Sequence, residues 1–325
     1  MPGVRSSMGK HLAVVLKDPN TAQEIFGAND DNLAVFEELL KVHVYLQGNQ
    51  VYLDSENSDI RQTFKAMISQ LEDHIRLGQL PGPHLIRAVH GTLDSGSSEN
   101  VDLLKKTKVI IPNGVKKVFP RSFNQAVYLR SIEKREMVFG IGPAGTGKTY
   151  LAVAQALKDI LTKVKRKLIL TRPVVEAGEN LGFLPGDLEQ KISPYLRPLY
   201  DAMEALIPME MIRRLEENRI IEIAPLAYMR GRTLSDCFII LDEAQNTTRE
   251  QMKMFLTRIG EGSKTIITGD ITQIDLPNRK QCGLINVISV LEAIEEIDFI
   301  FLQEQDVVRH PLVRKIVKAY ETAEE

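Results

Sequence analysis

Residues 138–149 read VFGIGPAGTGKT, in which a short apolar run is followed directly by GPAGTGKT, Gly142–Thr149. The second part satisfies G-x-x-x-x-G-K-[ST], the pattern of a phosphate-binding loop between a strand and a helix. Glycines let backbone N–H groups point at phosphate oxygens, and the helix N-terminus adds positive potential. Because both flanks have the required character, the stretch predicts an α/β fold built around a nucleotide. A glycine-rich turn without function is the weaker alternative.

The loop predicts which side chains contact ATP and its Mg²⁺. Lys148 is expected to reach the β- and γ-phosphates, and Thr149 to offer its hydroxyl to the metal. Gln125 precedes the first core strand, and its side-chain amide can both donate to and accept from adenine. A role away from the nucleotide explains Gln125 nearly as well. The residues expected to bind ATP are Gln125, Gly142, Pro143, Ala144, Gly145, Thr146, Gly147, Lys148 and Thr149.

A second signal is an acidic pair after an apolar run. Phe238–Asn246 reads FIILDEAQN, and ligand sites in open α/β sheets lie at the carboxyl ends of the strands. Asp242 is expected to hold Mg²⁺ through water, and Glu243 to act as the general base for the attacking water. A helix N-cap is the structural alternative for such a pair, and the upstream loop makes it the weaker one.

A third element, Thr268–Pro277, reads TGDITQIDLP and also follows an apolar run. It is expected to bring Asp270 and Gln273 to the same edge of the sheet. The Gln273 amide can hydrogen-bond to the γ-phosphate or to the attacking water and so sense the nucleotide. Otherwise Gln273 is a solvated residue in a polar turn.

The composition is that of an ordinary globular protein. Of 325 residues, 43% are hydrophobic and 26% are charged, and no apolar run approaches the ~20 residues that a membrane span needs. Two cysteines are too few for a disulfide framework, and the N-terminus shows no secretory leader, so a cytoplasmic protein is expected. Because the net charge is −2, any nucleic-acid site has to be a local basic patch.

Short apolar runs alternate with helical stretches in the larger, C-terminal part of the chain. Such runs predict strands covered on both faces, and therefore a parallel α/β sheet. The expected organisation is a small α+β domain with a linker over residues 1–100 and a P-loop ATPase domain over residues 101–325. The strand candidates are Val138–Ile141, Leu168–Thr171, Ile220–Ile223, Phe238–Leu241, Thr265–Thr268 and Phe299–Phe301.

The N-terminal domain is expected to contain a helix, two strands and a second helix. The strands, 42–46 and 51–53, flank a turn at Gly48–Asn49, and apolar residues at helical spacing predict the second helix over 59–77. Asp94–Asn100, DSGSSEN, is expected to be a flexible linker. The domain loosely resembles KH-type RNA-binding units, but its turn lacks the second glycine of a G-x-x-G clamp. An assembly role is an equal expectation.

Seven segments carry a resemblance to a known family. They are NQAVYL (124–129), FGIGPAGTGKTYLAVA (139–154), TRPVVEAGENLGFLPGDL (171–188), AYMRGRTL (227–234), LDEAQNTT (241–248), TGDITQIDLP (268–277) and VVRHPLVRKI (307–316). Together they resemble the PhoH-like family of P-loop ATPases, from about Lys108 onward. The resemblance implies a domain with a RecA-like sheet and ATPase activity. That family is in turn similar to the first motor domain of superfamily 1 helicases, which implies RNA or single-stranded DNA as a partner.

The helicase resemblance also implies an oligomer. In those helicases the nucleotide lies between two motor cores, and the second core contributes an arginine, whereas only one core fits into this chain. An arginine from a neighbouring subunit is worth on the order of 10³–10⁵ in rate, and a head-to-tail ring would place one in every pocket. Arg309 is the first candidate and Arg232 the second. For each, a surface or salt-bridging role is an equal alternative.

Contacts with nucleic acid are expected at Arg172, since the corresponding region of the helicases contacts the strand backbone. Two basic runs are weaker candidates, because such runs are usually only solvated. They are Lys105, Lys106, Lys108, Lys116, Lys117 and Arg121, and Lys163, Lys165, Arg166 and Lys167.

The leading hypothesis is an oligomeric ATPase that binds or remodels single-stranded RNA, with helicase activity as one form of it. A small-molecule kinase also uses a P-loop, but it would need an acceptor pocket. The remaining alternative is an ATP-binding regulatory adapter that recruits an RNA-processing partner such as a nuclease.

Overall fold

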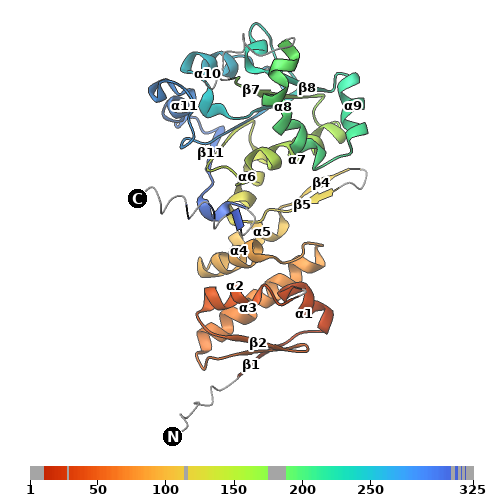
Figure 1. Cartoon of the computed structure of the whole chain (residues 1–325), viewed down its shortest axis with the longest axis vertical. Helices are drawn as coiled ribbons and strands as arrows, with labels where there is room; N and C mark the ends of the chain where they lie inside the picture. The colour runs from red at the N-terminus through yellow and green to blue at the C-terminus, as the bar shows by residue number, and fades with distance from the viewer. Residues whose placement is uncertain are drawn as a thin grey trace. The chain divides into compact units, whose positions relative to one another are not determined.

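The computed structural model describes residues 11–27, 29–112, 116–174 and 188–308, together with Leu312, Val313, Ile316 and Ala319. Its contacts divide the chain into two compact units (Figure 1). The first contains the residues up to Thr107 and Phe119–Ala126, and the second contains Lys108–Val118 and the residues from Val127 onward. Each unit has its own buried apolar core.

The first unit packs helices against a three-stranded antiparallel sheet with the order β1–β3–β2. The rings of Phe26, Phe36 and Phe64 are fully buried in its core, with neighbouring ring centroids 5.4 and 5.6 Å apart. Its elements are β1 (His11–Val15), α1 (Pro19–Phe26), α2 (Leu33–Leu40), β2 (Val44–Gln47), β3 (Gln50–Leu53), α3 (Ser58–Arg76), α4 (Pro83–Asp94) and α5 (Ser98–Lys106).

The expected helix, two strands and second helix are α2, β2, β3 and α3, but the unit contains more than these. β1 pairs with β3, and α1 lies between β1 and α2. Neither was expected from the hydrophobic pattern. The pairing of β1 has an irregularity between Leu12 and Val14, and such a bulge interrupts the strict alternation by which a strand is recognised in a sequence.

The expectation of a flexible linker at Asp94–Asn100 is wrong. α4 ends at Asp94, and α5 begins at Ser98, where the hydroxyl of Ser97 accepts a hydrogen bond from the Asn100 N–H at 3.3 Å. Serine is a favoured N-cap residue. The polar residues that suggested a linker therefore include the cap and the first turn of a helix. α5 buries Leu104 in the first core, and the first unit therefore extends past residue 100.

A six-stranded sheet forms the centre of the second unit. Its order is β11–β6–β10–β9–β7–β8, and all neighbouring strands are parallel. β10 lies between β6, which leads into the phosphate-binding loop, and β9, which leads into the acidic pair. This is the order of a RecA-like sheet, and the predicted fold class is confirmed. The strands are β6 (Met137–Ile141), β7 (Lys167–Arg172), β8 (Ile221–Pro225), β9 (Cys237–Leu241), β10 (Lys264–Gly269) and β11 (Ile297–Phe301), with a separate hairpin of β4 (Val109–Ile111) and β5 (Lys116–Val118).

Helices cover both faces of this sheet, because successive residues of a strand point to opposite sides. Phe238 and Ile240 of β9 belong to the core formed with α6, α7, α8 and α9, whereas Ile239 and Leu241 belong to the core formed with α10 and α11. Figure 1 shows α10 and α11 on one side of the strands and α8 and α9 on the other. The helices are α6 (Phe123–Lys134), α7 (Lys148–Leu161), α8 (Leu188–Glu204), α9 (Met209–Glu217), α10 (Arg249–Leu256) and α11 (Gly283–Leu291), with 3₁₀ turns η2 (Leu226–Met229), η3 (Ala244–Asn246), η4 (Arg279–Gln281) and η5 (Glu304–Asp306).

Within the described ranges, no helix is both long enough and apolar enough to cross a bilayer.

α6 approaches the sheet closely at Gly140 of β6. A Cβ atom on this residue would lie 2.8 Å from atoms of the Tyr128 side chain, which is fully buried. The Tyr128 hydroxyl also donates to the backbone oxygen of Lys148 at 3.4 Å. The absence of a side chain at Gly140 thus lets a buried tyrosine reach the start of α7.

We expect Gly140→Ala to destabilise the protein by about 1–3 kcal/mol, because the added methyl group overpacks the site of the Tyr128 ring. Urea unfolding followed by circular dichroism measures the loss. In a Tyr128→Leu background the same substitution should cost clearly less, since the smaller side chain leaves room. An equal cost in both backgrounds would contradict this packing argument.

Candidate active site

The phosphate-binding loop joins β6 to α7, as its sequence requires. Gly145 and Gly147 have φ angles of 84° and 82°, in the left-handed region that residues with a side chain rarely adopt. α7 begins at Lys148, directly after Gly147. The loop and the positive end of α7 therefore form one wall of a pocket suited to phosphate.

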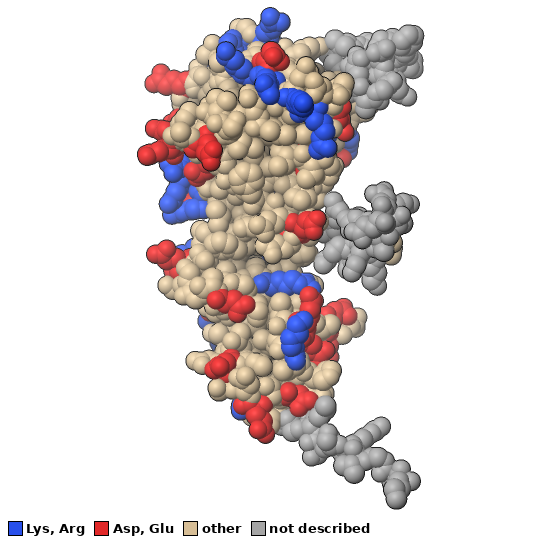
Figure 2. Space-filling model, turned by 90° about the vertical axis from the view of Figure 1, so that its left-hand side faces the viewer, with Lys and Arg blue, Asp and Glu red and all other residues tan. Residues whose placement is uncertain are grey.

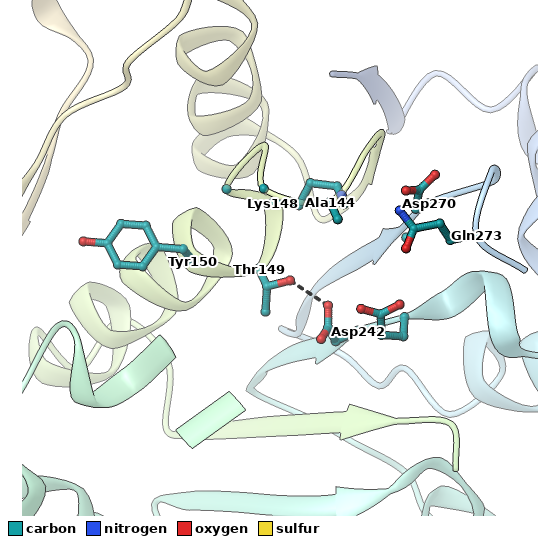
Figure 3. Close-up of a pocket in the computed structure, with 11 residues that line it drawn as sticks. Ala144, Lys148, Thr149, Tyr150, Asp242, Asp270 and Gln273 are labelled. Carbon is teal, nitrogen blue, oxygen red and sulfur yellow. Dashed lines mark hydrogen bonds between the residues drawn. The ribbon is translucent and has the colours of Figure 1, made fainter. Parts of the chain in front are cut away.

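Three neighbouring strands end at this pocket (Figure 3). The loop follows β6, the acidic pair follows β9, and the third element follows β10. Because the strands are parallel, their carboxyl ends lie at one edge of the sheet, and the three segments meet there. The lining residues are Ala144, Gly145, Gly147, Lys148, Thr149, Tyr150, Asp242, Glu243, Gly269, Asp270 and Gln273.

A hydrogen bond joins the loop to the acidic pair. The Thr149 hydroxyl donates to Oδ1 of Asp242 at 2.6 Å, and the Thr268 hydroxyl donates to the same oxygen at 2.7 Å. Figure 3 draws the first of these bonds. Hydroxyl and carboxylate oxygens are ligands that Mg²⁺ accepts, and Mg²⁺ at phosphate sites takes only one or two protein ligands. The pair Thr149 and Asp242 therefore fits the predicted metal position, although the described residues contain no dedicated cluster of three or more metal ligands.

Lys148 is folded back over its own loop. Its Nζ donates to the backbone oxygens of Gly142 at 2.5 Å and Pro143 at 2.8 Å. Burial lowers the pKa of the Lys148 ammonium, and the carboxylates of Asp270, Asp242 and Glu243 raise it. Within the described part of the chain, Lys148 is the one positively charged residue that lines the pocket.

Glu243 has a strained backbone and a well-defined set of contacts. Its φ of 53° and ψ of 41° are left-handed, a conformation that costs a non-glycine residue about 1 kcal/mol or more and is often found at functional sites. Its Oε2 accepts from Nε2 of Gln245 at 2.5 Å, and its Oε1 pairs with Nη2 of Arg172 at 3.4 Å. Arg172 also donates to the backbone oxygen of Tyr195 at 3.3 Å, so both partners hold the Glu243 carboxylate in place.

Asp270 is the most buried carboxylate of the third element. It is 5% exposed, and its Oδ1 accepts from the N–H and the hydroxyl of Thr272 at 2.9 and 2.6 Å. Its Oδ2 has no hydrogen-bond partner among the described residues. Gln273 lies beside it and donates its N–H to the Asp270 backbone oxygen at 3.2 Å. In Figure 3 both side chains lie across the pocket from Tyr150.

The structure brings together most of the residues that the sequence indicated. Lys148, Thr149, Asp242, Glu243 and Gln273 line one pocket. The loop residues Gly142, Pro143 and Thr146 do not line it, but Nζ of Lys148 hydrogen-bonds to all three. The sequence did not indicate Tyr150, which directly follows the loop, or Gly269, which directly precedes Asp270. Neither residue belongs to a motif of its own. Gln245 was missed too, although it is the fourth letter of DEAQ.

Gln125 is not among the residues that line this pocket. Gln125 is buried in the first unit, where its Oε1 accepts from the Arg121 N–H at 2.7 Å, and its adenine contact stays a prediction. Arg309 and residues 175–187 of the segment after Arg172 lie outside the described residues. Val308, which precedes Arg309, donates its N–H to the backbone oxygen of Gly145 at 2.9 Å.

Arg232, the second arginine candidate, is engaged at the opposite edge of the sheet. Its Nη1 and Nη2 donate to Glu222 at 2.5 and 3.0 Å, and Lys167 donates to the same carboxylate at 2.5 Å. Arg232, with Lys167 as the second partner, lowers the pKa of Glu222 to about 2. Lys167 and Glu222 lie near the starts of β7 and β8, so this ion-pair cluster is remote from the carboxyl ends that carry the pocket.

Comparisons with known proteins identify the relatives of this chain. The family model of the PhoH-like protein matches residues 117–321. A PhoH-like protein of Mycobacterium tuberculosis is 48% identical over 324 residues, which cover 99% of this chain and 91% of that protein. A PhoH-like protein of Bacillus subtilis is 44% identical over 318 residues, which cover 97% and 99%. The solved structure of the Pif1 helicase from Candida albicans matches 60% of this chain and 42% of that chain at 17% identity, with a TM-score of 0.31, a likeness too low to carry an argument.

We expect Glu222→Gln to lower the free energy of unfolding at neutral pH and much less in acid. The pKa of Glu222 is lowered from 4.5 to about 2 in the folded protein, so its ion pairs stabilise the fold above pH 4.5 and lose that effect as the pH falls towards 2. Urea titrations of both proteins at about pH 7, 4 and 3 give the difference. A difference that stays the same at the lowest pH would contradict the lowered pKa.

Proposed function

This chain belongs to the PhoH-like protein family, and from its P-loop pocket we propose that it binds ATP with Mg²⁺ and hydrolyses it to ADP and phosphate. The observation that carries the proposal is the meeting of Lys148, Thr149, Asp242, Glu243 and Gln273 at one pocket, with Thr149 and Asp242 joined by a 2.6 Å hydrogen bond. These are the parts that phosphoryl transfer to water needs: a cradle, a metal position, a base and a residue that contacts the γ-phosphate.

Each part has a role in the proposed reaction. Lys148 would leave the loop carbonyls and bind the β- and γ-phosphates, while Thr149 and Asp242 would hold Mg²⁺. The bound metal would neutralise charge that develops on the phosphates. Glu243 would accept the proton of the attacking water, and the hydrogen bond from Gln245 would keep its carboxylate oriented towards it.

We further propose that hydrolysis is coupled to single-stranded RNA. Support comes from the ion pair between Arg172 and Glu243, 3.4 Å long, because it links a candidate nucleic-acid residue to the candidate base. A phosphate that bound Arg172 would weaken this pair and change the position of the Glu243 carboxylate. The rate of ATP hydrolysis would then depend on whether RNA is bound.

An oligomer is the remaining part of the proposal. Lys148 is the sole cation among the pocket-lining residues in the described ranges, whereas efficient P-loop ATPases add an arginine near the γ-phosphate. Arg309 is the candidate, acting in the pocket of a neighbouring subunit. Arg232 is a poorer one, because Glu222 already accepts two of its donors.

We expect Lys148→Ala to abolish ATP binding, and Glu243→Gln to bind ATP but turn it over at least ~10²-fold more slowly, as when a general base is lost. Calorimetry with ATP and steady-state phosphate release measure the two effects. Glu261→Gln removes an exposed carboxylate of the same unit and should change neither. Micromolar ATP affinity in Lys148→Ala would refute the phosphate-binding loop, and normal turnover in Glu243→Gln would favour an adapter that only holds ATP.

A mixing experiment tests the arginine in trans. Arg309→Ala should lose on the order of 10³-fold or more in turnover, and Lys148→Ala should be inactive. If the arginine acts in the neighbouring pocket, a mixture of the two variants regains activity, because intact pockets then meet intact arginines. No recovery in mixed oligomers would place Arg309 in the pocket of its own chain or away from the reaction.

A further inference from the structure

Four basic side chains gather on the α10 side of the second unit, and no predicted function includes them. Arg249 and Lys253 are one turn apart on α10, and Arg279 and Lys280 begin η4. Arg249 Nη2 donates to the backbone oxygen of Lys280 at 2.8 Å, which fixes η4 against α10. These four residues form the α10–η4 basic cluster. Figure 2 views this side and shows Lys and Arg side chains in a band across its upper part.

The cluster carries more positive than negative charge within the described part of the chain. All four side chains belong to exposed residues, and none takes part in an ion pair there, whereas many other basic residues do. Arg249 and Arg279 hold backbone oxygens through one nitrogen each. A guanidinium has five N–H donors, so most donors of both arginines remain available to a ligand.

The arrangement fits a phosphate polymer. Arg249 and Lys253 are four residues apart on a helix, which separates them by about 6 Å along its axis, so two neighbouring phosphates can each find a cation. Glu250, next to Arg249, offsets part of its charge: a backbone N–H and the Thr248 hydroxyl, and then the Arg249 guanidinium, lower the pKa of the Glu250 carboxyl. In a chain with a net charge of −2, this local excess of positive charge is what a nucleic-acid backbone requires.

We propose that the α10–η4 basic cluster binds the phosphate backbone of single-stranded RNA and that Arg279 transmits this binding to the ATP pocket. The proposal rests on the RNA-coupled ATPase function above and names the surface that binds the RNA. The basic runs seen in the sequence are poorer candidates, since Lys105, Lys106 and Lys167 are already paired with carboxylates.

A chain of hydrogen bonds connects the cluster with the pocket. Arg279 Nη2 donates to the backbone oxygens of Ile271 and Thr272 at 3.5 and 3.3 Å. The N–H and hydroxyl of Thr272 donate to Oδ1 of Asp270, and Asp270 and Gln273 both line the pocket. A phosphate that takes the Nη2 donor of Arg279 competes with these two oxygens. The turn that carries Gln273 is then released from Arg279.

The first test measures RNA affinity by fluorescence anisotropy with a labelled oligouridylate over a range of salt concentrations. Arg249→Gln/Lys253→Gln should weaken binding at least ~10-fold at about 0.1 M salt. It should also reduce the slope of log affinity against log salt by about 1.4, since each phosphate contact to a single strand contributes about 0.7. Arg213→Gln/Arg214→Gln removes the same charge from exposed positions of α9, on the other face of the sheet, and should change neither quantity.

The second test measures coupling. In Arg279→Gln the ratio of phosphate release with oligouridylate to release without it should fall at least ~5-fold, the lower end of typical coupling between sites. Lys134→Gln removes an exposed charge at the end of α6 and should leave the ratio unchanged. An unchanged ratio in Arg279→Gln would overturn the proposed transmission.

The outcomes separate this proposal from the ATPase function. Unchanged affinity and salt slope in the α10 double variant would overturn the RNA surface, and so would a wild type that hydrolyses ATP but binds no oligouridylate; in both cases the ATPase function stands. A wild type without turnover, whose RNA affinity still depends on the cluster, would support the surface and refute the ATPase function. Displacement of the RNA by polyglutamate at equal charge concentration would show an unspecific anion site and overturn the proposal.

Discussion

The hydrogen bond from Thr149 to Asp242 is the interaction on which the site depends. It joins residues 93 positions apart and connects the start of α7 with the end of β9 across the intervening strand β10. It forms because β6, β10 and β9 are parallel neighbours whose carboxyl ends share one edge. With another strand order, the loop and the acidic pair would each keep their local shape but would lie too far apart to hold one nucleotide.

The charges at this edge also explain why the pocket suits a nucleotide with its metal. Asp242, Glu243 and Asp270 face a single cation, Lys148, in the described part of the pocket, and Oδ2 of Asp270 has no partner there. Phosphates alone would add to this negative charge. A divalent cation held beside Thr149 and Asp242 offsets it, and an arginine contributed from elsewhere would do so further.

Gln245 joins the acidic pair to the turn after β10. It is 1% exposed, and its amide donates to Glu243 and accepts from the Asp270 N–H at 3.0 Å. A Cβ on Gly269 would lie 2.9 Å from its Oε1, so a glycine is needed where the amide passes. A movement of the turn after β10, such as the release of Arg279 would produce, therefore reaches the Glu243 carboxylate through one buried side chain.

The sequence by itself determined the phosphate-binding loop, the acidic pair and the six strands, because glycine geometry and apolar strand runs are local properties of the chain. It failed at β1, where a bulge hides the alternation, and at Asp94–Asn100, where a capping serine resembles a linker. Only the tertiary structure decided which charged residues pair, namely Arg232 with Glu222 and Arg172 with Glu243. It also decided that α10 lies beside η4. Ion pairs and surface clusters depend on distances through space, and these are set by the order in which the strands assemble, which spacing along the chain does not encode.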